Sequence, residues 1–200
     1  LVTMGGADPD NITLTVLEAL GALADADVTV RVLLGPANPN RTDVEKTAAQ
    51  CGFDCGIINS TRNMPELIDW ADLAVTAGGS TTWELAFMGV PAIYIIAADN
   101  QTNIVKELDR HGAGINTGWF NQLETSELAR KINHLVSRPD LRQRMSLQAQ
   151  SLIKGNGRNI VCMIMNHVSR QNSLAITIIS DSDSWINPYI QQLKQQIQSE

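Results

Sequence analysis

Two glycine pairs in this chain stand between strand-like and helical patterns, and one of them is followed by side chains that can hold a phosphate and a sugar hydroxyl. Gly79, Ser80 and Thr81 stand between an apolar run that predicts a buried strand and a pattern that predicts a helix. Glycine lets a ligand approach the backbone closely, and the first N–H groups of a helix are free to bind anions. Glu84, one helical turn beyond Ser80, adds a carboxylate acceptor. The stretch predicts a nucleotide site, although an ordinary strand–turn–helix with Ser80 as N-cap explains it about equally well.

The second glycine pair, Gly5 and Gly6, also lies between a strand-like run and a helical pattern, which Asp10 or Asn11 is expected to cap. Two such turns at the ends of parallel strands suit a ligand that lies across the carboxyl edge of an open α/β sheet. Neither turn has the GxGxxG or the GxxxxGK[ST] spacing. NAD binding and ATP hydrolysis are therefore disfavoured.

Composition narrows the class of protein. Of 200 residues, 44% are hydrophobic and 18% are charged, which is typical of a soluble globular protein. The formal net charge of −6 argues against nucleic-acid and membrane-surface partners, so backbone N–H groups and hydroxyls would hold a phosphate. No apolar run reaches the length of a membrane span. Three cysteines in no zinc pattern predict reduced thiols, no metal and a cytoplasmic location, with Cys51 and Cys55 as buried small residues and not a redox pair.

Strand-like and helical patterns alternate along most of the chain. Strands are expected at residues 1–4, 29–34, 55–58, 73–76, 92–96 and 114–116. Helices are expected at residues 11–24, 42–50, 64–70, 82–88, 100–111 and 126–136, followed by two more at 139–153 and 156–169. This alternation predicts an α/β fold, a Rossmann-like parallel sheet with helices on both faces.

The predicted nucleotide-binding domain covers residues 1–170. After a polar break, residues 174–179 read as a fresh strand and residues 188–197 as a Gln-rich amphipathic helix. We interpret residues 173–200 as the first β–α unit of a following, truncated domain, in preference to an extra edge strand on the first sheet. The chain opens inside a strand and has no initiator Met, which is expected for a piece of a longer protein.

Three motifs carry a resemblance to a known family: residues 4–11 (MGGADPDN), 77–85 (AGGSTTWEL) and 99–101 (DNQ). Together they resemble the carboxy-terminal domain of the UDP-sugar hydrolase of pseudaminic acid synthesis, and spore-coat polysaccharide biosynthesis proteins share the pattern. The chain is similar, more distantly, to the murein-precursor N-acetylglucosaminyltransferase and to the GT-B fold generally. Residues 177–189 also resemble, more weakly, the opening of formyltransferase-like domains.

The resemblance implies a UDP-sugar ligand and a role for each matching residue, without a cofactor. It places the diphosphate at Gly5, Gly6, Gly79, Ser80 and Thr81, the ribose at Glu84, the uracil at Asn63 and Met64, and the sugar at Asn100 and Gln101. For Asn100 and Gln101, a helix cap with a solvated neighbour is the alternative interpretation.

The resemblance also implies that catalysis needs an amino-terminal domain of the same parent chain, which supplies the catalytic histidine and is absent here. None of His111, His134 and His167 lies in a glycine-rich loop, so we expect no catalytic residue in this fragment. The leading hypothesis is the UDP-sugar-binding half of a nucleotide-sugar hydrolase in surface-polysaccharide or nonulosonate synthesis. The alternatives are the donor-binding domain of a GT-B glycosyltransferase and a non-catalytic nucleotide-sugar-binding module.

Overall fold

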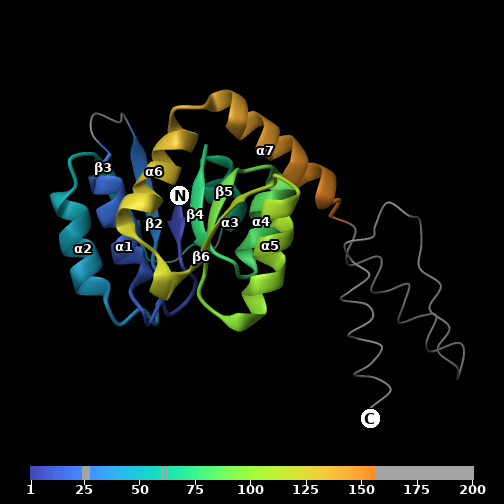
Figure 1. Ribbon diagram of the computed structural model, residues 1–200. Helices are drawn as coiled ribbons and strands as arrows, with labels where there is room; N and C mark the ends of the chain where they lie inside the picture. Colours follow the sequence, from blue (N-terminus) through green and yellow to red (C-terminus); the bar gives the residue numbers. More distant parts are fainter. Residues whose placement is uncertain (24–27, 60, 62, 156–200) are drawn as a thin grey trace, which may run out of the picture. The chain divides into compact units, whose positions relative to one another are not determined.

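The computed structural model describes residues 1–23, 28–59, 61 and 63–155 (Figure 1). Leu1–Lys154 form one compact unit around a six-stranded parallel sheet with the strand order β3-β2-β1-β4-β5-β6. The strands are β1 (Val2–Thr3), β2 (Thr29–Leu33), β3 (Asp54–Ile58), β4 (Ala74–Ala77), β5 (Ala92–Ile96) and β6 (Ile115–Trp119). The predicted fold class, a Rossmann-like parallel sheet, is confirmed.

Helices connect the strands and follow the last one. They are α1 (Ile12–Gly21), α2 (Arg41–Gln50), α3 (Met64–Asp69), α4 (Thr81–Met88), α5 (Thr102–Arg110), α6 (Thr125–Val136) and α7 (Pro139–Leu152), with short 3₁₀ helices η1 (Asp99–Gln101) and η2 (Phe120–Gln122). None of the helices in the described ranges combines the length and the apolar character that a membrane span requires.

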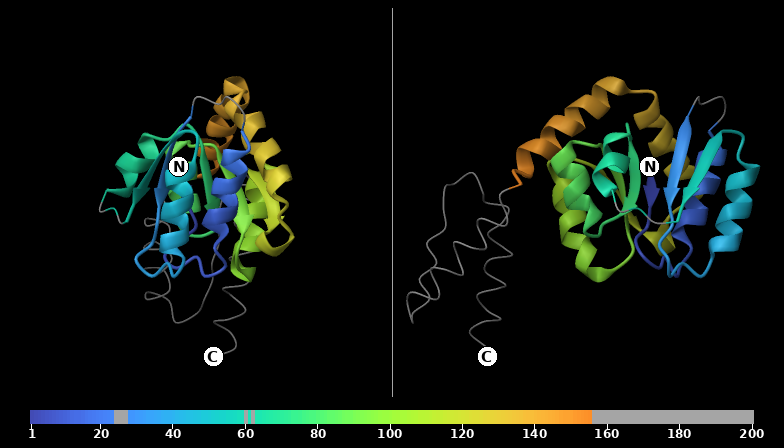
Figure 2. Two further views of the ribbon diagram at one scale, coloured as in Figure 1. Left: turned by 90° about the vertical axis from the view of Figure 1, so that its left-hand side faces the viewer. Right: turned by 180° about the vertical axis from the view of Figure 1, so that it is seen from behind.

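Both faces of the sheet are covered by helices, as the two views of Figure 2 show. The strand period of two separates the core into two clusters, because neighbouring side chains point to opposite faces. On β5, Ile93 and Ile95 belong to the cluster under α1, α2 and α6, whereas Tyr94 and Ile96 belong to the cluster under α3, α4 and α5. A strand buried on both faces reads as a continuous apolar run, which is why residues 92–96 were recognisable from sequence.

Helix α7 passes from one core cluster to the other. Met145, in its first half, packs with the cluster that contains α1 and α6, while Ala149, one turn later, packs with the cluster that contains α4 and α5. Figure 1 shows this helix running past the sheet from α6 toward α4. It therefore joins the two helical layers away from the glycine turns, which follow the carboxyl ends of their strands.

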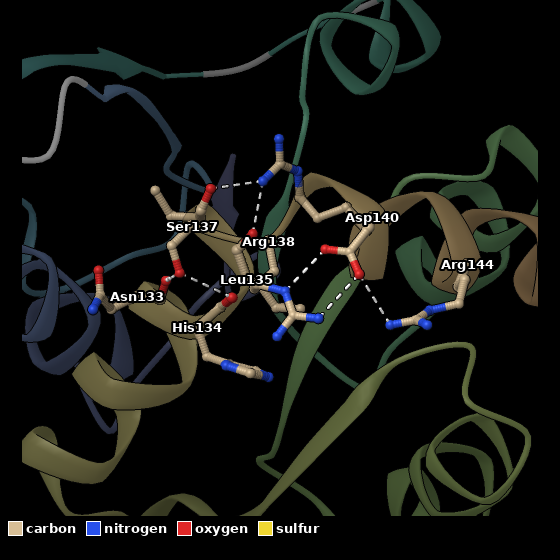
Figure 3. Close-up of polar contacts among 9 residues, drawn as sticks. Asn133, His134, Leu135, Ser137, Arg138, Asp140 and Arg144 are labelled. Carbon is tan, nitrogen blue, oxygen red and sulfur yellow. Dashed lines mark hydrogen bonds and ion pairs between the residues drawn. The ribbon is translucent and has the colours of Figure 1, made fainter.

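The corner between α6 and α7 is stabilised by arginines (Figure 3). The Arg142 guanidinium donates to the carbonyl oxygens of Leu135 and Val136, at 2.7 and 2.8 Å, and so pairs two of the last carbonyls of α6. Asp140, in the first turn of α7, lies 2.9 Å from Arg138 and 3.2 Å from Arg144. The hydrogen bond from Arg138 lowers the pKa of Asp140 to about 2.

Several predicted boundaries were wrong by a few residues. Strand β6 extends to Trp119, and the predicted helix at 100–111 is split into η1 and α5. Asp10 and Asn11 do not cap α1 with their side chains; the carboxylate of Asp8 does so instead. The predicted helix at 156–169 and the predicted β–α unit at 173–200 lie outside the described residues, so these predictions and the domain boundary at 170 stay open.

Candidate functional site

The two glycine turns follow neighbouring strands at the point where the strand order reverses. β1 pairs with β2 on one side and with β4 on the other, and Val2 lies in register with Val75. In open α/β sheets a ligand binds outside the carboxyl ends of the strands at such a reversal, because the connections leave in opposite directions and open a crevice. The structure therefore brings Gly5 and Gly6 to the same edge of the sheet as Gly79, Ser80 and Thr81.

In the β4–α4 turn the two glycines have different surroundings. A methyl group built on Gly78 would come within 2.4 Å of Val105 Cγ2 and 3.0 Å of Gln101 Cβ, so this position packs against α5 and η1. A methyl group on Gly79 would meet nothing within 4 Å. Open space beside Gly79, next to a helix N-terminus, is where an anion can approach the backbone.

The N-terminus of α4 carries no side-chain cap. Ser80 occupies the N-cap position in a helical conformation, and its hydroxyl makes no capping hydrogen bond. Ser80 is exposed and Thr81 is half-buried. Ser80 is therefore the N-cap residue by position but lacks the side-chain hydrogen bond of an ordinary N-cap, and its hydroxyl is available to an incoming ligand.

The β1–α1 turn is held by the loop after β2. Gly5 has a φ of 89°, in the left-handed region that favours glycine. The carbonyl oxygen of Gly6 accepts a hydrogen bond from the Ala37 N–H at 3.3 Å, and a Cβ at Gly35 would lie 2.1 Å from that same oxygen. Gly35 therefore permits the close approach of the two loops, while Gly6 itself faces open space.

Asp8 is the buried carboxylate of this turn, with only 5% of its surface exposed. Its Oδ1 accepts from the Ile12 N–H at 2.8 Å and its Oδ2 from the Thr13 N–H at 2.9 Å. Both bonds satisfy N–H groups in the first turn of α1, where a negative charge is favoured by the helix dipole. The N-terminus of α1 is thus occupied from within the protein, in contrast to that of α4.

Glu84 projects from the exposed surface of α4. It lies four residues after Ser80, so the two side chains share one face of the helix near its N-terminal end. This is the placement expected of a carboxylate that accepts from a ligand held at the glycine turn. Its role as the ribose acceptor stays a prediction.

Asn100 and Gln101 follow β5, the neighbour of β4, and reach the same edge of the sheet. Asn100 is exposed. The side chain of Gln101 is half-buried, and its Oε1 accepts from the Ala97 N–H at 2.9 Å. The carboxamide oxygen of Gln101 therefore shapes the turn after β5. Contact of Asn100 and Gln101 with a sugar stays a prediction.

Asn63 and Met64, predicted to lie at the uracil pocket, have separate environments. Asn63 donates from Nδ2 to Glu66 Oε2 at 2.5 Å and lines a cavity of about 290 Å³. Met64 is not among the residues that line this cavity, and it packs against the core under α3 and α4. The cavity extends along the sheet to Arg31, which lies 5.5 Å from the Trp70 ring centroid.

A larger cavity, of about 510 Å³, lies at the opposite edge of the sheet. Its lining includes Leu1, Val28 and Leu73, which begin or precede strands, together with Arg142 of α7. Because the glycine turns follow the strands, this cavity belongs to the amino edge and not to the candidate site.

Other titratable groups do not form a reactive centre among the described residues. No group of three or more His, Cys, Asp or Glu side chains in this part of the chain could hold a metal ion. Cys51 and Cys55 are free and half-buried, which corrects the prediction that they are buried. Burial raises the pKa of both thiols, that of Cys55 to about 11, so they stay protonated at neutral pH. His111 ends α5, His134 is exposed on α6, and His167 lies outside the described residues.

Sequence reasoning missed the residues that support the turns. Asn40 donates from Nδ2 to the Asp8 carbonyl oxygen at 3.3 Å, and Arg41 donates to the Gly35 carbonyl oxygen at 3.3 Å and to Asn59. These contacts join the loops after β1, β2 and β3. The only local signal was the cluster of turn-forming Asn and Pro residues at 36–40, which predicts a loop but not its partners.

The chain matches the model of a known protein family. The model of the glycosyltransferase family 28 C-terminal domain covers residues 1–158, more than half of the chain. The chain belongs to this family. The match includes both glycine turns, Glu84 and residues 99–101, and it ends within the stretch that begins after α7.

Curated relatives agree with the family match. Spore coat polysaccharide biosynthesis protein SpsG of Bacillus subtilis is 26% identical over 172 residues, which cover 86% of this chain and 50% of that protein. The UDP-N-acetylglucosamine--N-acetylmuramyl-(pentapeptide) pyrophosphoryl-undecaprenol N-acetylglucosamine transferase of Geobacter sulfurreducens is 29% identical over 159 residues, 77% of this chain and 43% of that protein. The chain thus spans about half the length of the curated relatives it matches.

Solved structures show the same fold at lower identity. MurG of Acinetobacter baumannii superposes with a TM-score of 0.67 at 19% identity, covering 82% of this chain and 49% of MurG. Anabaena HepE, solved in complex with UDP-glucose, gives 0.66 at 18% identity over 85% of this chain and 48% of HepE. The described unit therefore has the fold of one half of a GT-B glycosyltransferase.

These findings change the order of the hypotheses. The family match favours the glycosyltransferase alternative over the hydrolase that sequence analysis put first. Neither the family description nor the names of these relatives supports pseudaminic acid synthesis or a formyltransferase-like tail.

Proposed function

We propose that this domain binds the nucleotide-sugar donor, a UDP-sugar, of a GT-B glycosyltransferase that acts in polysaccharide synthesis. The observation that carries the proposal is the uncapped N-terminus of α4, with open space at Gly79, beside the turn after β1. The SpsG and Geobacter relatives support a polysaccharide product and a UDP-sugar donor. We further propose a cytoplasmic site of action.

The roles of the side chains follow from their positions. Gly79, Ser80 and Thr81 hold the diphosphate through backbone N–H groups and hydroxyls, and Gly5 and Gly6 line its other side. Glu84 accepts from the ribose hydroxyls, since charged acceptors form strong, short hydrogen bonds. Asn63 and the neighbouring backbone contact uracil, and Asn100 and the Gln101 amide nitrogen contact the sugar. The binding site for the acceptor and the catalytic base are supplied by an amino-terminal domain of the parent protein.

Titration calorimetry with UDP, with and without EDTA, tests the proposal. We expect one UDP per domain and the same affinity in both conditions, because backbone groups and hydroxyls need no cation to hold the phosphates. No heat at millimolar UDP, or binding only with a divalent cation, contradicts this grip. In the full-length parent, transfer of the sugar to an acceptor alcohol distinguishes a glycosyltransferase from a hydrolase, which uses water, and from a non-catalytic module, which consumes neither.

A further inference from the structure

We propose that Asp8 is a positioning residue that holds the Gly5–Gly6 turn in the shape that admits the diphosphate, with Asn40 as its support. The inference rests on the proposed function, since it assigns a task within the same nucleotide site. Asp8 lies two residues after Gly6 in a turn that otherwise consists of exposed residues at 5–7 and 9–10. It is the buried exception in this turn, with 5% of its surface exposed.

Both carboxylate oxygens of Asp8 accept hydrogen bonds from within the protein. The donors are the N–H groups of Ile12 and Thr13, at 2.8 and 2.9 Å. Because the N-terminus of α1 already holds this negative charge, it does not also offer those N–H groups to a phosphate. Asp8 therefore acts on the ligand through the turn it anchors and not by contact.

The backbone of Asp8 is held from a second direction. Its φ of 43° lies in the left-handed region, which a non-glycine residue adopts only where its surroundings support it. Its carbonyl oxygen accepts from the Asn11 N–H at 3.1 Å and from Asn40 Nδ2 at 3.3 Å. Asn40 is itself fixed, because its N–H donates to Asn38 Oδ1 at 2.8 Å. The chain from Asn38 through Asn40 to Asp8 thus joins the loop after β2 to the turn after β1.

The same two loops meet at Gly6, where the Ala37 N–H donates to the Gly6 carbonyl oxygen. The turn is therefore held on both sides of residue 7. Ala37 bonds the carbonyl oxygen of residue 6, and Asn40 bonds the carbonyl oxygen of Asp8. A turn that is ordered before the ligand arrives binds more tightly, since less conformational entropy is lost on binding. Loosening these contacts is expected to weaken the hold on the phosphates and to spare the uridine end.

The test measures affinities for uridine, UMP and UDP in the wild-type chain, in four single variants and in the double variant Asp8→Ala/Asn40→Ala. Asp8→Ala removes the anchor, Asn40→Ala removes its support, Asp8→Asn retains one of the two acceptors, and Asp10→Ala is the control. Asp10 is exposed and carries the same charge two residues away, so it corrects for the loss of a negative charge near the phosphates. Ligand-free denaturation of each variant shows that the affinities refer to folded protein.

We expect Asp8→Ala and Asn40→Ala each to lower the preference for UDP over UMP by about tenfold, with uridine affinity unchanged. Asp8→Asn is expected to be intermediate, and Asp10→Ala to keep the preference of the wild type. The double variant Asp8→Ala/Asn40→Ala is expected to lose little more than the larger single loss, because the two residues support one turn. A merely structural role would weaken all three ligands together.

Two results overturn the inference. One is an unchanged UDP preference in folded Asp8→Ala or Asn40→Ala protein, and the other is a double variant whose loss is the sum of the two single losses. If Asp8→Ala does not fold, Asn40→Ala and Asp8→Asn decide the question. A wild-type domain that binds UDP no better than uridine contradicts the proposed function itself and removes the inference with it.

Discussion

Thr3 on β1 lies in register with Thr76 on β4, and both side chains are buried at the centre of the parallel sheet. Gly5 follows the first threonine by two residues and Gly78 follows the second by two, so the glycine pairs leave the sheet at the same level. The two turns are 73 residues apart in the sequence and follow adjacent strands in the fold, as the proposed diphosphate site requires.

Adjacent glycines of the β4–α4 turn are expected to respond differently to alanine. Gly78→Ala should lower the free energy of unfolding by about 1–3 kcal/mol, because its Cβ would press on Val105 in a packed core. Gly79→Ala should leave stability within about 0.5 kcal/mol, since open space surrounds that position. Urea denaturation measures both, and equal losses would mean that Gly79 is also a packing glycine.

Filling the space beside Gly79 should remove ligand binding without unfolding the protein. Gly79→Leu places a side chain where the phosphate is proposed to lie, so UDP affinity should fall by more than about tenfold, or ~1.4 kcal/mol. Calorimetry measures this affinity, and Gly52→Leu is the control because it also faces open space, but beyond α2. Unchanged UDP binding in Gly79→Leu would place the diphosphate elsewhere.

Glu84 is expected to bind ribose and not to act in catalysis. Glu84→Ala should weaken UDP by about 1.5–3 kcal/mol, the usual cost of losing a charged hydrogen-bond partner. The same change should barely alter affinity for a 2′,3′-dideoxy analogue of UDP, which has no hydroxyls to donate. Glu18→Ala, at an exposed glutamate of α1, is the matched control. Equal losses for both nucleotides would show that Glu84 does not contact the ribose.

Tyr94 offers a test of stability that is independent of the ligand. Its side chain is fully buried on β5 and its hydroxyl has no hydrogen-bond partner among the described residues. An unpaired buried hydroxyl costs about 1–3 kcal/mol of desolvation. Tyr94→Phe is therefore expected to keep or raise the free energy of unfolding at pH 7, as measured by urea denaturation. A loss above about 1 kcal/mol would indicate that the hydroxyl has a partner.

The same residue predicts a pH dependence. Burial raises the pKa of the Tyr94 phenol, so the unfolded chain ionises near the ordinary value of about 10 while the folded protein stays protonated. The stability that depends on this group is present below about pH 10 and is lost as the pH rises above it. Wild type should therefore lose more stability than Tyr94→Phe between about pH 10 and 11. Parallel curves for the two proteins would contradict the shift.

Catalysis is expected to be absent from this chain alone. α5 starts at the carboxyl edge of the sheet, after β5, so His111 at its other end lies away from the glycine turns, 3.7 Å from Glu107. A general base needs hydrogen-bond reach of the attacking group. Residues 1–200 should release no UDP from UDP-sugars in a coupled assay, even where binding is measurable. Adding the amino-terminal part of the parent should restore turnover, and His111→Ala should leave it near the wild-type rate. Release of UDP by the chain alone would contradict this division.

The sequence by itself determined the elements and the residues that could bind a phosphate. Apolar runs such as 92–96 and the alternation of strand and helix depend on local periodicity, and local periodicity is visible in a single chain. The two glycine pairs were visible for the same reason, because they interrupt those patterns. The fold class and the position of both turns followed from these signals.

Only the tertiary structure decided which turns are neighbours and how they are supported. The pairing of β1 with β4 depends on the packing of helices on both faces, and nothing near Thr3 in the sequence specifies Thr76 as its partner. The choice of Asp8 over Asp10 as the cap of α1 has the same origin. All acidic residues near a helix start look alike in sequence, but only the one that is buried and bonded to Ile12 and Thr13 can cap the helix. Its link to Asn40 spans 32 residues, a separation that no local pattern records.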